Sequence, residues 1–215
     1  YDPLEKPLMI LPAAHTFLGG AYVNEFCETT LQGLYAAGEA MGGLHGANRI
    51  GGCAGAETFV FGAIAGKNAS GYAAVNGLDL NKADTVVRQV LSSYSGTANS
   101  QAEAEAEDKL QSVLSSSLSL IRDGAGCSVA SKAAKEICFQ VPTMDKSAPE
   151  LLWKSKQLEN KAMLIHMIAD ASVYRKESRG VFFRSDYPEP DNQNCLFSVL
   201  AKDVNGSTCI RTLKR

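Results

Sequence analysis

Histidine and arginine side chains lie beside glycine-rich segments in the first part of the sequence. His15 lies four residues before a pair of glycines and His45 two residues after one, in segments without a regular hydrophobic period. Such irregular segments often carry binding or catalytic groups. Arg49 is surrounded by small residues, so its planar guanidinium could enter a cavity and bind a carboxylate through two hydrogen bonds. A surface salt bridge is an equally open interpretation of Arg49. His166 falls within a long predicted helix and is interpreted as a structural or a surface residue.

An acidic residue and a helix start offer sites for hydroxyl groups and for negative charge. Glu39 directly follows a predicted buried strand over residues 33–38. An acid at the carboxyl end of a strand in an α/β fold can accept hydrogen bonds from sugar or ribityl hydroxyls, although simple exposure to solvent is equally open. The helix predicted from about Ala56 to Val75 presents free N–H groups and a positive dipole end to an anion.

Glycine and alanine dominate the segment that must position these side chains. Eight of the 19 glycines lie between residues 42 and 66, and glycine permits close approach of the backbone to a ligand or to another backbone. Within the helix over 56–75, we expect Gly62 and Gly66 to allow close packing against a sheet. The side chains expected to face inward are Phe59, Ile64 and Ala65.

Hydrophobic spacing predicts a helical region after this segment. Asp84 is expected to cap its first helix, and further helices are predicted over about 103–122, 128–138 and 148–177. Asp123-Gly124 is expected to end the helix over 103–122. Four helices with short connections predict an antiparallel bundle.

The end of the chain carries a hairpin signal. Prolines within residues 187–191 break regular structure, and Leu196–Lys202 and Thr208–Leu213 then alternate around Asn205-Gly206. The predicted fold class is therefore α+β: a glycine-rich closing segment of an α/β domain, a helical bundle and a C-terminal β-hairpin. The predicted domains are residues 1–76, 77–186 and 187–215.

Composition excludes several classes of protein. The 21 Lys+Arg are balanced by 23 Asp+Glu, which argues against a basic nucleic-acid binder, and the 45% hydrophobic content argues against a disordered chain. No apolar run is long enough for a transmembrane helix, and no signal peptide is visible at the start. Six cysteines without a CxxC pair are interpreted as free thiols in a reducing compartment, with disulfides as the second interpretation and no metal site expected.

Several motifs in register resemble the fumarate reductase/succinate dehydrogenase flavoprotein family, to which L-aspartate oxidases also belong. The motifs are His15-Thr16-Phe17-Leu18-Gly19-Gly20, residues 33–39 (GLYAAGE), 45–52 (HGANRIGG) and 61–66 (FGAIAG), and Glu177-Ser178-Arg179-Gly180 with Arg184, Asp186 and Tyr187. The resemblance implies an FAD-dependent oxidoreductase that transfers hydride between flavin and a fumarate/succinate-like dicarboxylate. His15 and Arg49 would contact a substrate carboxylate.

The resemblance also implies a flavin site. Gly38 and Glu39 would bind FAD, with the Glu39 carboxylate on the ribityl chain. The backbone at Ala54 and Gly55 would face the pyrimidine edge of the flavin, where a helix N-terminus stabilises the negative charge of the reduced form. Residues 177–180 and Arg184 would hold the helical domain against the flavin domain.

The sequence also departs from the family's pattern. It contains no GxGxxG, which the family uses for the FAD pyrophosphate, and the capping domain that supplies the proton-donating arginine would precede His15. We therefore expect FAD binding and turnover to need another chain or segment that carries both parts, and we expect an oligomer because an unpaired strand edge would be exposed. The expected location is cytoplasmic, or at a membrane through partners. The alternative is a non-catalytic fragment or assembly module with vestigial flavin motifs.

Overall fold

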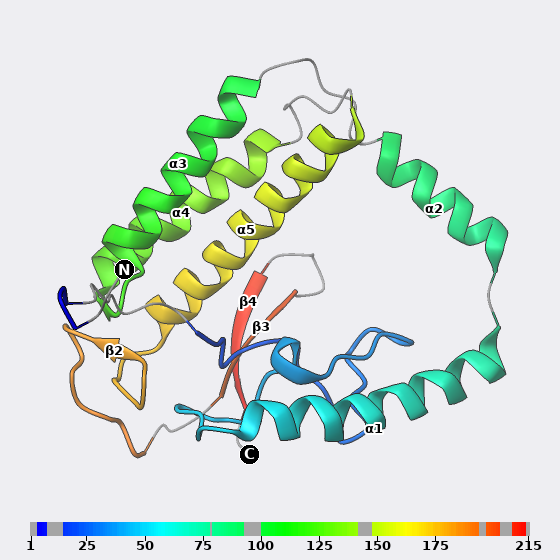
Figure 1. Cartoon of the computed structure of the whole chain (residues 1–215), viewed down its shortest axis with the longest axis horizontal. Helices are drawn as coiled ribbons and strands as arrows, with labels where there is room; N and C mark the ends of the chain where they lie inside the picture. The colour runs from blue at the N-terminus through cyan, green and yellow to red at the C-terminus, as the bar shows by residue number, and fades with distance from the viewer. Residues whose placement is uncertain are drawn as a thin grey trace. The chain divides into compact units, whose positions relative to one another are not determined.

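The structure is a computed structural model that describes residues 4–7, 15–77, 79–92, 100–141, 148–193, 197–202 and 208–213. The chain divides into two compact units, Tyr1–Gly77 and Leu78–Arg215, which are described separately below and drawn in Figure 1. The division into three domains at residues 76 and 186 stays a prediction.

The longest element of the first unit is the helix α1 (Cys53–Asn76). It begins a turn earlier than predicted because Gly52 adopts the left-handed conformation, with φ of 85°, and starts the helix there. It ends at Gly77, whose φ is 66° and whose N–H donates to the carbonyl of Ala73. Glycine adopts these dihedral angles without the steric cost that a side chain would add.

Short backbone bridges replace the strand predicted over 33–38. Tyr35 alone pairs there, with Glu28, and the short 3₁₀ helix η1 (Gly38–Ala40) follows. The prediction of a buried strand was wrong, since Leu34 is 52% exposed and one bridging residue does not make a ladder. The small core of this unit consists of Cys27, Met41 and Ala65, against which Val23, Tyr35, Ala37, Phe61 and Ile64 pack.

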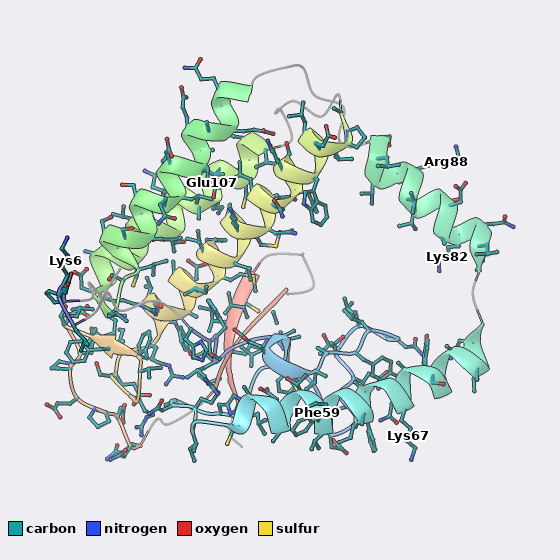
Figure 2. All side chains as sticks on the ribbon, in the orientation of Figure 1. Lys6, Phe59, Lys67, Lys82, Arg88 and Glu107 are labelled. Atoms are coloured by element: carbon teal, nitrogen blue, oxygen red, sulfur yellow. The ribbon has the colours of Figure 1, made fainter. Side chains whose placement is uncertain are left out.

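The inward face of α1 was only partly predicted. Ala65 is buried and Ile64 packs against it, whereas Phe59 is 82% exposed on the helix surface (Figure 2). A side-chain carbon added at Gly62 or Gly66 would meet no described atom within 4 Å. These glycines therefore make no close helix–sheet contact within the described residues.

The second unit is built on helices α2 (Leu80–Ser92), α3 (Ser100–Ser117), α4 (Gly124–Gln140) and α5 (Pro149–Tyr174). Helices α3, α4 and α5 lie side by side in Figure 1 and share one core. The fully enclosed members of this core include Ala130, Ala134, Ile137 and Ala162. Helix α2 has no buried residue among those described, so the core is formed by three helices where four were predicted.

Contacts between the helices establish the direction of each. Lys109 at the middle of α3 pairs with Glu136 near the end of α4 at 3.0 Å. The Ser117 carbonyl at the end of α3 lies beside Gly126 at the start of α4, so α3 and α4 run antiparallel.

Ser131 on α4 donates to Asp170 near the end of α5 at 2.5 Å. Cys138 at the end of α4 lies near Glu159 in the first half of α5, so these two helices are antiparallel as well. His166 contacts the same serine hydroxyl at 2.9 Å and thus connects two helices, as its structural interpretation expects.

Two helix caps differ from those predicted. Asp79, rather than Asp84, precedes α2 and accepts the N–H of Lys82 at 3.0 Å, while Asp84 lies within the helix and pairs with Arg88 at 2.6 Å. Asp123 does not end a helix. Its carboxylate accepts the N–H of Gly126 at 2.7 Å and caps the start of α4.

The strands of the second unit are short. Strand β1 (Ile121–Arg122) pairs in parallel with β2 (Phe183–Arg184). Strands β3 (Phe197–Lys202) and β4 (Thr208–Leu213) pair antiparallel with Phe197 opposite Leu213, which confirms the hairpin. Its predicted turn at Asn205-Gly206 lies outside the described residues. Within the described residues, no helix has the length and apolar character needed to cross a membrane.

Candidate functional site

Two side chains from distant parts of the first unit converge on the segment that contains His15. Glu39, in η1, accepts the backbone N–H of Phe17 at 2.8 Å. Arg49 donates from Nη2 to Oγ1 of Thr16 at 3.3 Å. The structure therefore gathers His15, Glu39 and Arg49 around one segment, and no carboxylate among the described residues forms an ion pair with Arg49.

Close backbone contact explains the glycine at position 20. A side-chain carbon at Gly20 would clash with the carbonyl oxygen of Ala40 and approach the backbone of Met41 to 2.8 Å. The contact brings the two segments into register, because the Ala21 N–H donates to the Ala40 carbonyl at 2.8 Å. Gly19, in contrast, has no described neighbour within 4 Å of such a carbon.

The N-terminus of α1 lies beside the residues expected to bind the cofactor. Gly52 provides no side-chain cap, so the first N–H groups of the helix, including those of Ala54 and Gly55, have no partner inside the helix. Gly38, with φ of 65°, approaches this end of the helix, since a carbon added to it would lie 3.4 Å from Oγ1 of Thr58. Helix start and η1 thus meet near Gly38.

A buried contact between a histidine and a carboxylate joins the Arg49 turn to α1. Nε2 of His45 lies 2.9 Å from Oε2 of Glu57, and the two side chains are 10% and 3% exposed. The second carboxylate oxygen of Glu57 is buried and has no hydrogen-bond partner among the described residues. Both side chains line a hollow of about 370 Å³ that also includes Asn48 and Cys53.

The sequence interpretation missed Glu57 and Thr16. Glu57 carried a signal, because it is the one acidic residue of α1 and its neighbours in the first half of the helix are apolar or small, and a charge in such a setting needs a partner. Thr16 carried no comparable signal, since its role depends on where the Arg49 side chain ends.

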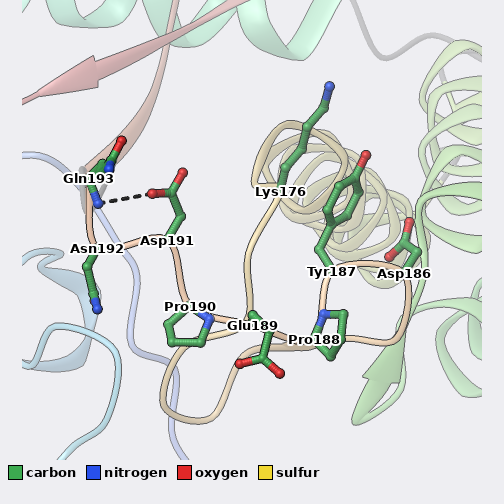
Figure 3. Close-up of a pocket in the computed structure, with 9 residues that line it drawn as sticks. All are labelled: Lys176, Asp186, Tyr187, Pro188, Glu189, Pro190, Asp191, Asn192 and Gln193. Atoms are coloured by element: carbon green, nitrogen blue, oxygen red, sulfur yellow. Dashed lines mark hydrogen bonds between the residues drawn. The ribbon is translucent and has the colours of Figure 1, made fainter.

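A second hollow, of about 590 Å³, lies in the other unit after β2. Figure 3 shows Lys176 and Tyr187 at one side of it and the segment from Glu189 to Gln193 at the other, where the Gln193 N–H donates to Asp191 at 3.0 Å. Five cysteines are described, and all are free thiols.

Charged residues beside this hollow bind one another. Glu177 is buried and accepts hydrogen bonds from Arg175, from Arg179 at 2.9 Å and from the N–H of Asp191 at 2.8 Å. Burial acts to raise the pKa of Glu177, but the hydrogen bond from Arg179, the one from Asp191 and the nearby positive charges outweigh it. The pKa of Glu177 is therefore lowered.

Arg184 is the most enclosed charged side chain among the described residues of the unit, with 2% exposure. It donates to both oxygens of Asp186, at 2.7 and 2.6 Å, and to the backbone carbonyls of Ser172 and Arg175 at the end of α5. The hydrogen bond from Arg184 holds the pKa of Asp186 well below its usual range. Asp186 in turn accepts the N–H of Gly124 at 3.0 Å, so this pair connects α5, β2 and α4.

Two family models match this chain. The FAD binding domain matches residues 2–54, and the model described as fumarate reductase flavoprotein C-term matches residues 107–212. A glycine-rich unit at the start of α1, followed by a helical unit of this kind, defines the class as an FAD flavoprotein.

Individual relatives agree with the class. The chain is 36% identical over 191 residues to an uncharacterized FAD-dependent oxidoreductase of Methanocaldococcus jannaschii, with 87% of this chain and 35% of the relative covered. It is 30% identical over 200 residues to one subunit of the fumarate reductase (CoM/CoB) of Methanothermobacter marburgensis, with the same two shares. A mutant quinol fumarate reductase of Escherichia coli has a TM-score of 0.84 at 26% identity, covering 99% of this chain and 38% of that chain.

The chain belongs to the fumarate reductase/succinate dehydrogenase flavoprotein family. It spans about a third of the length of the relatives it matches, 35% for both the Methanocaldococcus and the Methanothermobacter protein. The resemblance and the fold class expected from the motifs are thus confirmed.

Proposed function

We propose that this chain forms part of an FAD-dependent oxidoreductase that acts on a fumarate/succinate-like dicarboxylate. The observation that carries the proposal is the hydrogen bond from Arg49 to Thr16 at 3.3 Å. It sets the Arg49 guanidinium beside Thr16, the residue that follows His15. The guanidinium of Arg49 and the imidazole of His15 could then reach the same substrate carboxylate. A guanidinium fork binds a carboxylate through two parallel hydrogen bonds, which would fix the orientation of the substrate.

The residues present fit one edge of a flavin. The N–H groups at Ala54 and Gly55 start α1 without a side-chain cap, and the positive end of a helix favours an anion. One oxygen of Glu39 already accepts the Phe17 N–H, which leaves the other for a ribityl hydroxyl beside Gly38. FAD, when bound, supplies the hydride acceptor or donor.

The rest of the FAD site must come from another chain or segment. No GxGxxG is present in the sequence, so these residues do not cradle a pyrophosphate. The surface of α1 supports such a partner, because Phe59, Val60 and Val75 are largely exposed on it. A helix with large apolar side chains exposed on it is typical of a position inside a larger protein, and we expect the partner to carry the dinucleotide-binding and capping parts. An oligomer, in the cytoplasm or held at a membrane through its partners, follows from this arrangement.

Native mass spectrometry with an absorbance spectrum tests the proposal on protein purified gently from its source. We expect a complex larger than the 22.9 kDa chain with a flavin band at about 450 nm, since isoalloxazine absorbs there when oxidised. A flavin-free chain of monomer mass would contradict the proposal and favour an assembly module whose flavin motifs are vestigial.

Replacing Arg49 with Lys tests the substrate role directly. Lysine keeps the charge but loses the fork that binds both carboxylate oxygens. We expect kcat/KM for fumarate reduction by the flavin-loaded complex to fall about 100-fold, as for other precisely oriented catalytic groups. Arg88→Lys, on the exposed face of α2, is the matched control. Unchanged kinetics in Arg49→Lys would remove this role from Arg49.

A further inference from the structure

We propose that Glu57 is a positioning residue that acts through His45 to fix the turn from which Arg49 reaches the substrate carboxylate. The identity of that substrate rests on the proposed function. The effect of Glu57 on the turn rests on geometry within the first unit alone.

The environment of Glu57 requires its partner. The side chain is 3% exposed and sits in a helix with no other acidic residue. Its Oε2 lies 2.9 Å from His45, and its Oε1 has no partner among the described residues. A buried carboxylate with half of its hydrogen-bonding capacity unused is expensive to keep. The hydrogen bond to His45 offsets this cost, because a hydrogen bond in a buried site of low dielectric is stronger than one in water.

The turn that carries His45 needs an external attachment. Gly43 and Gly46 flank His45 with φ values of 95° and 62°, dihedral angles that continue neither a strand nor a helix. Side-chain hydrogen bonds from His45 and Arg49 help attach this turn to the rest of the unit. His45 binds Glu57 on α1, and Arg49 binds Thr16.

These two attachments act on the same short segment. Only three residues separate His45 from Arg49, so release of the first leaves the guanidinium attached through one hydrogen bond of 3.3 Å to a hydroxyl. The position of a group that orients a substrate matters at the scale of about 1 Å, where misplacement can reduce the rate about 100-fold. Glu57 therefore affects substrate binding without touching the substrate.

Hydrogen exchange and calorimetry test the inference on the purified protein, with any partner chain and flavin retained. Glu57→Leu removes the contact with His45 and fills the space, while Glu57→Gln keeps the shape and a neutral hydrogen bond. In Glu57→Leu we expect amide exchange over residues 43–49 to rise about tenfold while exchange in α4 stays unchanged. We expect the Kd for fumarate to rise about tenfold, with Glu57→Gln between the wild type and Glu57→Leu.

A double-mutant cycle shows whether Glu57 acts through His45. We expect His45→Leu combined with Glu57→Leu to raise the fumarate Kd no further than the more severe single variant. Lys67→Gln removes an exposed charge further along α1 (Figure 2) and should leave both exchange over 43–49 and the Kd at their wild-type values.

Three results would overturn the inference. Unchanged exchange over residues 43–49 in folded Glu57→Leu or Glu57→Gln would show that the pair does not fix the turn. Raised exchange with an unchanged Kd would show that the turn does not position Arg49, and fully additive effects would show that Glu57 does not act through His45. If the wild-type protein binds no fumarate, the proposed function fails, and the exchange measurement still decides whether Glu57 fixes the turn.

Discussion

Single residues in the first unit act mainly through backbone geometry and isolated polar contacts. Gly20 lies against the backbone of Ala40 and Met41, and the hydrogen bond between Ala21 and Ala40 depends on that approach. The segment that contains His15 thus reaches its place because one position has no side chain. The same segment then receives Glu39 at Phe17 and Arg49 at Thr16.

Substituting Gly20 tests this explanation. A methyl group at position 20 would clash with the Ala40 carbonyl, so Gly20→Ala should destabilise the first unit by about 1–3 kcal/mol, the usual range for forced overpacking. Gly19→Ala is the matched control, since its added carbon meets no described atom within 4 Å. Hydrogen exchange over residues 15–42 measures both, and equal protection in the two variants would contradict the role of Gly20.

At the residue scale, the sequence predicts groups whose type and setting are unusual. Arg49 stood out because small residues surround it, and Glu39 because it follows a predicted strand. The structure brings both side chains to the segment that contains His15. Glu57 was missed because its importance comes from burial beside His45, and burial depends on how the turn folds over α1. The role of each of these residues in binding stays a prediction.

Elements in the second unit are held by packing and by their caps. Helices α3, α4 and α5 share a core rich in alanine, which lets helices approach closely. Hydrophobic spacing was sufficient to predict these helices because each buries one stripe of side chains. The strand over 33–38 failed because pairing depends on partners distant in sequence, and Asp84 failed as a cap because Asp79 precedes the helix and makes that contact.

The cap of α4 provides a prediction at this scale. Asp123→Ala removes the acceptor for the Gly126 N–H, and the loss of such a cap typically costs about 1 kcal/mol. The free energy of unfolding of the second unit, measured in urea, should fall by that amount. Asp79→Ala removes the equivalent cap from α2, which buries no described residue, so it should leave the urea midpoint unchanged. Equal effects of both variants would mean that α2 belongs to the cooperative core.

Across the whole molecule, the two units differ in what stabilises them. The first has a small core and many exposed apolar side chains on α1, so its stability should depend on a covering partner. The second has a continuous helical core together with a group of buried charges at the end of α5. Those charges connect segments far apart in the sequence, as Arg184 does through Asp186 and Gly124.

Acid should therefore destabilise the second unit through these charges. The pKa values of Glu177 and Asp186 are lowered in the folded protein, so both carboxylates favour folding fully above their ordinary pKa values of about 4. This contribution is lost progressively as the pH falls below about 4, toward the lower folded values, because the unfolded chain then binds more protons than the folded one. The fluorescence of Trp153, the single tryptophan, follows urea unfolding of α5 from pH 7 to pH 3.

Removing one of the two carboxylates isolates its share of this pH dependence. Glu177→Gln should lower the urea midpoint at pH 7, because Arg175 and Arg179 lose the carboxylate that they share. The same variant should lose less stability than the wild type between pH 5 and pH 3. Glutamine does not titrate, so unfolding of the variant takes up fewer protons in this range. Asp84→Asn, at an exposed pair on α2, should keep the wild-type slope. A Glu177→Gln variant with both the wild-type midpoint and the wild-type slope would show that the charges around Glu177 do not stabilise this unit.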